Sequence, residues 1–219
     1  RPVKWRAERS EEFLAAHMGR DQHFKAWLAL DGAGKVLALK MEMLGDFGSV
    51  PVGSTAMIPL WVGPKVLTSV YHVPAVDYFI RGVLTNTMAT GAYRGAGRPE
   101  ANFLMERLLD KAARELKLDP AEIRRRNFIA PAAFPYQTHM GDTYDVGEFA
   151  RILERVLKLS DWENFKQRKE QSQKRGKLRG RGLASYLEWT GALPTETVDI
   201  EVAADGTVTV FSGTMAMGQ

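Results

Sequence analysis

TGAYRGAGRPEA, residues 90–101, joins a strand-like segment to the strongest helix pattern of the chain. Its glycines lack a Cβ, so they permit positive φ angles and let the backbone approach a ligand closely. Free amides at a helix N-terminus attract anions, and arginines add forked donors. The stretch lacks the Gly-Lys-Ser/Thr ending of a phosphate loop. It therefore indicates either a site for an anionic or oxo-rich ligand or a tight strand-to-helix turn with structural arginines.

The sequence on both sides of this loop predicts an α+β fold. Residues 76–84 have strand character, and residues 23–31 and 35–48 flank a Gly-Ala-Gly turn as in a β-hairpin. Pro99 starts a long amphipathic helix. The apolar face predicted for that helix consists of Phe103, Leu104, Leu108, Ala112 and Leu116.

Further elements follow from capping residues and from hydrophobic periodicity. The predicted elements are a strand at 1–5, a helix capped by Ser10, a helical turn near 54–61, a helix capped by Asp119, a helix at 146–160, a polar helix opened by Asp161, and strands within 182–191, 196–205 and 207–215. We expect two lobes, residues 1–175 and a truncated second lobe at 176–219.

Composition excludes several classes of protein. The chain has 219 residues, 45% of them hydrophobic, and no apolar run near the roughly 20 residues that cross a bilayer. It has no cysteine, which excludes disulfides and thiolate ligands and fits a cytoplasmic location. It opens without Met, shows no signal peptide, and stops directly after a strand-like run. We expect a piece of a longer protein.

Charge and histidine placement favour no further site. Residues 166–181 are rich in Lys and Arg, which indicates either a nucleic-acid-binding surface or a solvated helix end. No aromatic residue is interleaved for base stacking, so we expect no specific nucleic-acid binding. The histidines, at positions 17, 23, 72 and 139, do not have metal-ligand spacing, and we expect no metal ligand from the protein.

The residues from 85 to 129, TNTMATGAYRGAGRPEANFLMERLLDKAARELKLDPAEIRRRNFI, resemble the molybdenum hydroxylase family. This family includes xanthine dehydrogenase, aldehyde oxidase and the large subunit of aerobic carbon monoxide dehydrogenase. The resemblance continues at RPVKW, at RGLASYLEWTG and at the final SGTMAMGQ, in the order the family shows. It covers nearly the whole chain.

The resemblance implies part of an oxidoreductase that hydroxylates a C–H carbon of an aldehyde or N-heterocycle with water as the oxygen source. The alternative is a non-catalytic cofactor-binding or assembly module of the same fold. The implied cofactor is molybdenum–molybdopterin, in the cytosine dinucleotide form. The implied partners are a medium subunit with FAD and a small subunit with 2Fe–2S clusters, assembled as a dimer of heterotrimers.

The same resemblance assigns residues to the site. Arg94 and Gly95 would lie near the metal, in the catalytic region of the loop. The residues assigned to cofactor binding are Ala92, Tyr93, Arg94, Gly95, Gly97, Met217, Gly218 and Gln219. The carboxamide of Gln219 suits this role because it can both donate to and accept from a pterin edge.

The sequence departs from the family pattern at two loop positions. Gly95 stands where carbon monoxide dehydrogenases have a copper-binding cysteine, so we expect no copper site. Ala96 stands where xanthine dehydrogenases have a phenylalanine, so purine oxidation loses support and a wider pocket is expected. The family's Phe-Gly loop and its general-base glutamate are not found here, and we interpret Glu188 as a strand-end carboxylate. The small-molecule substrate does not follow from the fold.

Overall fold

A computed structural model describes residues 1–188 and 197–214. These residues mix helices and strands, which confirms the α+β expectation. The chain divides into two compact units, Arg1–Leu187 and Glu188–Gln219. Among the described residues, no helix is both long enough and apolar enough to cross a bilayer.

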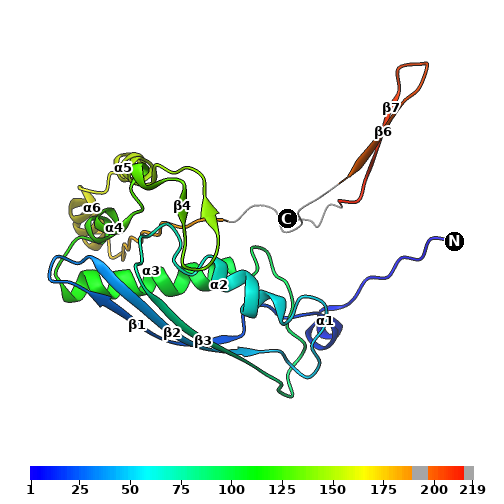
Figure 1. Cartoon of the computed structure of the whole chain (residues 1–219), viewed down its shortest axis with the longest axis horizontal. Helices are drawn as coiled ribbons and strands as arrows, with labels where there is room; N and C mark the ends of the chain where they lie inside the picture. The colour runs from blue at the N-terminus through cyan, green and yellow to red at the C-terminus, as the bar shows by residue number, and fades with distance from the viewer. Residues whose placement is uncertain (189–196, 215–219) are drawn as a thin grey trace. The chain divides into compact units, whose positions relative to one another are not determined.

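The first unit contains a three-stranded sheet, a long helix and a cluster of shorter helices (Figure 1). Its helices are α1 (Arg9–Ala15), the π-helix η1 (Ile58–Val62), α2 (Gly63–Lys65), α3 (Arg98–Glu115), α4 (Pro120–Asn127), the 3₁₀-helix η2 (Pro131–Ala133), α5 (Phe149–Leu159) and α6 (Phe165–Gln173). Its strands are β1 (Gln22–Leu30), β2 (Val36–Asp46), β3 (Val76–Val83), β4 (Tyr136–Gln137) and β5 (Thr143–Tyr144).

The sheet has the order β1–β2–β3. Strands β1 and β2 form the predicted antiparallel hairpin, with Phe24 opposite Met43. The carboxylate of Asp31 accepts from the amides of Ala33 and Lys35, at 2.9 and 2.8 Å, and so fixes the turn. Strand β3, also predicted, runs parallel to β2 after the connection that contains η1 and α2. Strands β4 and β5 form a separate short hairpin.

Helix α3 begins at Arg98, one residue before the predicted Pro99, and lies between the sheet and the cluster of α4, α5 and α6 (Figure 1). Its fully buried side chains include Met105 and Leu109, both 0% exposed. Phe103, which was predicted to lie on the buried face, is 66% exposed, and Leu116 is exposed as well. The prediction of that face was wrong at these two positions because the helix is covered on two sides, which shifts the buried stripe.

The helix caps are partly as predicted. Asp119 caps α4, since its carboxylate accepts from the amide of Ala121 at 2.7 Å. Helix α1 instead begins after Glu8, whose amide donates to Glu11 at 3.2 Å, so Ser10 is not the cap. Helix α6 begins after Asn164 and not at Asp161. The predicted helix at 146–160 is confirmed as α5.

Two predicted strands are absent from the described residues. Residues 1–8 form neither helix nor strand, and the described part of the 182–191 segment, residues 182–188, is also irregular. In the second of these segments, the backbone at Leu183 and Ser185 is instead bound by buried side chains of α3 and α4. The turn predicted near 54–61 is extended into η1 and α2.

The second unit contains the predicted hairpin of β6 (Val198–Val202) and β7 (Val208–Ser212). Its antiparallel register places Ile200 opposite Val210. The amide of Thr207 donates to the carboxylate of Asp205 at 2.9 Å in the connecting turn. The assigned cofactor contacts at Met217, Gly218 and Gln219 lie outside the described residues.

Candidate functional site

The candidate loop leaves β3 and is fixed where it approaches α3. Thr90 is 6% exposed and anchors this point. Its amide donates to the carbonyl of Phe47 at 3.3 Å, and its hydroxyl donates to the carbonyl of Asp46 at 2.8 Å. Its own carbonyl accepts from the hydroxyl of Thr55. The entry to the loop is therefore held by the end of β2 and by the segment before η1.

The carboxylate of Asp46 organises the preceding turn. It accepts from the amide of Gly48 at 2.7 Å and from the hydroxyl of Thr85 at 2.8 Å. Partial burial raises the pKa of Asp46, but these bonds and the nearby Thr87 hydroxyl outweigh that effect and hold the pKa below its usual value. Asp46 is thus a charged anchor of residues 83–90.

The crest of the loop faces solvent. Ala92, Tyr93 and Arg94 are exposed, and Tyr93 keeps 63% of its surface. Within the described residues, the amides of residues 92–95 donate to no protein acceptor, and the Arg94 guanidinium has no carboxylate partner. These groups form a set of unpaired donors beside the N-terminus of α3, which suits an anionic ligand.

Arg20 supports this crest, although no sequence pattern identifies it as a candidate. Its guanidinium donates to the carbonyl of Arg94 and lies over the ring of Tyr93, 4.7 Å from the centroid. Its Nε lies 3.9 Å from a carboxylate oxygen of the buried Glu100. Arg20 has a φ of 65°, a left-handed conformation that is uncommon for residues other than glycine and that the sequence does not predict. Arg20 thus links Tyr93 and Arg94 of the loop with Glu100 of α3, all of which are distant from it in sequence.

Two glycines of the loop have positive φ angles, 81° at Gly95 and 84° at Gly97. A Cβ on Gly97 would lie 2.8 Å from the amide nitrogen of Gly63, so this glycine is needed for packing against α2. A Cβ on Gly95 would lie 3.2 Å from Cγ of Pro99. A cofactor contact at Gly97 remains a prediction.

The two arginines of the loop differ in their surroundings. Arg98 donates from Nη1 to the carbonyl of Ala96 at 3.0 Å and closes the turn before α3. Arg94 accepts from Arg20 through its carbonyl, and its guanidinium has no hydrogen-bond or ion-pair partner among residues 1–188 and 197–214. The loop therefore contains one arginine that closes the turn and one that is exposed, whose role toward a ligand stays a prediction.

The structure brings five of the assigned residues together on this loop: Ala92, Tyr93, Arg94, Gly95 and Gly97. Across residues 1–188 and 197–214, no group of His, Asp and Glu is placed to hold a metal ion. The groups present on the loop are hydrogen-bond donors, a cation and an exposed aromatic ring. Such a set can bind and orient an anionic group, whereas it offers no acid–base pair.

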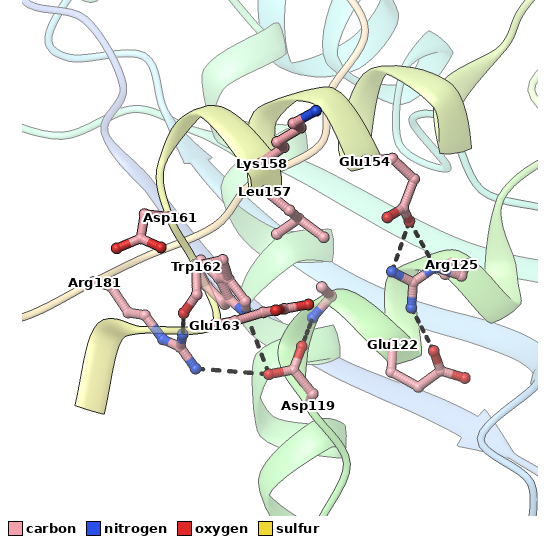
Figure 2. Close-up of a pocket in the computed structure, with 11 residues that line it drawn as sticks. Asp119, Glu122, Arg125, Glu154, Leu157, Lys158, Asp161, Trp162, Glu163 and Arg181 are labelled. Atoms are coloured by element: carbon pink, nitrogen blue, oxygen red, sulfur yellow. Dashed lines mark hydrogen bonds and ion pairs between the residues drawn. The ribbon is translucent and has the colours of Figure 1, made fainter. Parts of the chain in front are cut away.

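A separate pocket of about 910 Å³ lies among α4, α5, the segment between α5 and α6, and Arg181 (Figure 2). Most of its charged groups are paired with other side chains of the protein. Arg125 donates to Glu154 at 2.6 Å and to Glu122 at 2.5 Å, and Arg181 lies 3.6 Å from Asp119. None of the loop residues lines this pocket, and its paired charges indicate a structural role.

Several cations of the basic segment also have partners within the protein. Arg168 donates to Asp161 at 2.6 Å, and Arg179 donates to the hydroxyl of Ser172 at 2.9 Å. Arg181 lies 3.7 Å from the centroid of the Trp162 ring. These arginines order the end of α6 and the chain that follows it.

The fold and the exposed donor loop thus define a domain suited to holding an anionic cofactor against its backbone. Residues 1–128 match the model of a molybdopterin cofactor-binding domain, and residues 155–219 match a second molybdopterin cofactor-binding domain. The chain belongs to this molybdopterin-binding family.

Relatives agree with this assignment. The chain is 29% identical to the nicotine 6-hydroxylase large subunit of Paenarthrobacter nicotinovorans, over all of this chain and 28% of that protein. It is 35% identical to the carbon monoxide dehydrogenase large chain of Hydrogenophaga pseudoflava, over 91% of this chain and 26% of that protein. The structure of quinoline 2-oxidoreductase from Pseudomonas putida 86 matches with a TM-score of 0.88 and 33% identity, over 98% of this chain and 29% of that one. The chain therefore spans little more than a quarter of each relative.

Proposed function

We propose that the chain is part of the large subunit of a molybdenum hydroxylase, which hydroxylates a C–H carbon of an aldehyde or N-heterocycle with water as the oxygen source. Family membership over most of the chain supports this function. The observation that carries it to particular residues is the set of amides at 92–95 and the exposed guanidinium of Arg94, none of which is paired with another of the described residues.

In this proposal the loop holds the cofactor. Molybdopterin carries phosphate and oxo groups, which fit the unpaired donors of the crest. Ala92, Tyr93 and Arg94 would contact it, and Arg94 and Gly95 would lie near the metal. Gly97, Met217, Gly218 and Gln219 complete the proposed binding set. When bound, the cofactor supplies the oxygen transfer and accepts the electrons, whereas the protein binds and orients it.

The surroundings of Gly95 bear on the substrate class. A cysteine at this position would have to adopt a φ of 81° and would place its Cβ 3.2 Å from Pro99 Cγ. This conformation disfavours a side chain, which supports a molybdenum site without copper. The named activities of the relatives, on nicotine and quinoline, favour an N-heterocycle over carbon monoxide as the substrate.

The remaining features of the whole protein follow as proposals. The relatives are a large subunit and a large chain, which supports partners: a medium subunit with FAD and a small subunit with 2Fe–2S clusters, in a dimer of heterotrimers. We also propose the cytosine dinucleotide form of the cofactor. We propose a cytoplasmic location as well, because a chain without cysteine fits a reducing compartment. The two family matches, at residues 1–128 and 155–219, support two lobes, for which we propose the bounds 1–175 and 176–219.

The test begins with the full-length parent, purified from cells that make molybdopterin. We expect bound molybdenum and a pterin that is released by acid, together with oxidation of an N-heterocycle or aldehyde. Arg94→Ala should lower this activity well beyond about twofold, because it removes a cation beside the cofactor. The matched control is Arg81→Ala on the exposed sheet. A parent with neither molybdenum nor pterin would contradict the proposal.

The flanking sequence separates an enzyme from a non-catalytic module. An upstream Phe-Gly loop and a downstream Gly-Glu pair in the same reading frame support the enzyme. An intact frame without the glutamate supports the cofactor-binding or assembly module instead, because a missing general base typically costs about 10² to 10⁴ in rate.

A further inference from the structure

A charged network is buried between α3 and α4. Arg124 is 0% exposed, and its Nε donates to Oε2 of Glu106 at 2.8 Å. Its Nη2 lies 2.9 Å from Oδ1 of Asp110, and its Nη1 donates to the carbonyl of Pro120 at 2.8 Å. The guanidinium is thus satisfied by groups from both helices.

Tyr71 completes the network from the segment after α2. Its hydroxyl donates to Oε1 of Glu106, and its ring stacks on Phe128 with centroids 5.5 Å apart. Burial, together with the neighbouring charge of Glu106, raises the pKa of Tyr71 well above its usual value. Tyr71 therefore remains a neutral donor that fixes the orientation of the Glu106 carboxylate.

The network also holds a stretch of irregular backbone. The amide of Ser185 donates to Oε2 of Glu106 at 3.0 Å, and Nη2 of Arg124 donates to the carbonyl of Leu183 at 3.0 Å. Nδ2 of Asn102 lies 3.4 Å from the carbonyl of Leu187. Residues 183–187 form no helix or strand, so these side chains supply partners that secondary structure would otherwise provide.

The chemistry of this pair argues for a positional role. A buried ion pair is often no more stabilising than apolar residues of similar size, because both charges lose their water. Apolar residues at 106 and 124 would fill the same space but would offer nothing to the backbone at 183 and 185. What the charged pair adds is a defined path for residues 183–187.

We propose that Glu106 and Arg124 are positioning residues that form a buried clamp on residues 183–187. The clamp sets the point at which the chain leaves the first unit on its way to the residues of the second unit assigned to the cofactor. The path of 183–187 stands on the contacts above, whereas its consequence for cofactor binding rests on the proposed function.

The first test uses amide hydrogen exchange on the unmodified chain. The amide of Ser185 should exchange at least about tenfold more slowly than that of Leu178, because it donates to a buried carboxylate. Leu178 is 95% exposed and lies in the same irregular stretch of sequence. Equal exchange at the two amides, after correction for sequence, would overturn the clamp without any mutation.

The second test removes the pair and keeps its volume. In the double variant Glu106→Leu/Arg124→Met, exchange at Ser185 should rise about tenfold while far-ultraviolet circular dichroism stays unchanged. The control is Glu154→Leu/Arg125→Met, which removes an exposed ion pair between α4 and α5. Ser185 should stay protected in the control. Continued protection of Ser185 in the clamp variant would overturn the proposal.

If the double variant fails to fold, Glu106→Gln serves in its place, since it keeps the shape and removes the charge. Exchange at Ser185 should again rise, and an unchanged rate would count against the clamp. In the full-length parent, the clamp variant should retain less pterin than the surface control. Equal retention would overturn the link to the cofactor. An unmodified parent without pterin would contradict the proposed function instead, while the exchange results still decide the clamp.

Discussion

Gly97 and Gly63 lie so close together that a Cβ on Gly97 would come within 2.8 Å of the Gly63 amide nitrogen. This contact joins the end of the candidate loop to the start of α2. Backbone atoms cannot move aside as the end of a flexible side chain can. The position of the loop therefore depends on the close packing of these two glycines.

Gly97→Ala should destabilise the chain, because alanine adds both the strain of a φ of 84° and the collision with Gly63. The free energy of unfolding should fall by about 2 to 4 kcal/mol, measured by urea denaturation. Gly141→Ala is the control, since Gly141 has a φ of 88° with nothing near its missing Cβ. The control should cost only about 1 to 2 kcal/mol. Equal losses would show that the contact with Gly63 contributes nothing.

Arg20→Met should loosen the crest of the loop while the fold remains. The variant loses the contact with the Tyr93 ring and the hydrogen bond to the Arg94 carbonyl. An exposed cation–π contact contributes about 0.5 to 1 kcal/mol, so exchange of the Ala96 amide, which donates to the carbonyl of Tyr93 at 2.7 Å, should rise by a few fold. Arg81→Met removes a similar contact, over Phe79 at 5.4 Å, from the sheet surface. If both variants leave exchange of the Ala96 amide unchanged, Arg20 does not support the loop.

The hairpin, the strand before the loop and the helix after it were predictable, because their signals are local. The turn at residues 31–35 and the periodicity of α3 both arise from neighbours in sequence. The support from Arg20 was not predictable, since its positive φ is imposed by contacts with the distant residues Tyr93 and Arg94. The burial of Glu106 was also missed. A single amphipathic face assigns charges to solvent, whereas α3 is covered on two sides.

Leu109→Ala and Phe103→Ala test the buried face of α3. Leu109 is 0% exposed and Phe103 is 66% exposed on the same helix. Truncation at Leu109 leaves a cavity and should lower the free energy of unfolding by about 2 to 5 kcal/mol. Truncation at Phe103 should change it by less than about 1 kcal/mol in the isolated chain. Urea denaturation measures both losses in the free energy of unfolding. A larger loss for Phe103→Ala than for Leu109→Ala would support the face predicted from sequence.

Tyr144 should make stability fall at alkaline pH. Its ring is buried, its hydroxyl donates to the carbonyl of Ser69 at 3.2 Å, and burial, with smaller contributions from Asp142 and Tyr136, raises its pKa from 10.0 to about 12. The neutral phenol is therefore favoured in the folded state. Its contribution is complete below pH 10, the unfolded value, and is lost as pH rises toward about 12.

Tyr144→Phe should remove this part of the alkaline loss, because phenylalanine has no proton to lose. The urea midpoint of the variant should fall less steeply than that of the unmodified chain between pH 10 and about 12. At neutral pH the variant should be less stable by about 0.5 to 1.5 kcal/mol, since the carbonyl of Ser69 loses its donor. Tyr186→Phe is the control, because Tyr186 is 64% exposed. Parallel pH profiles for the Tyr144 variant and the unmodified chain would show that Tyr144 ionises no later in the folded state than in the unfolded state.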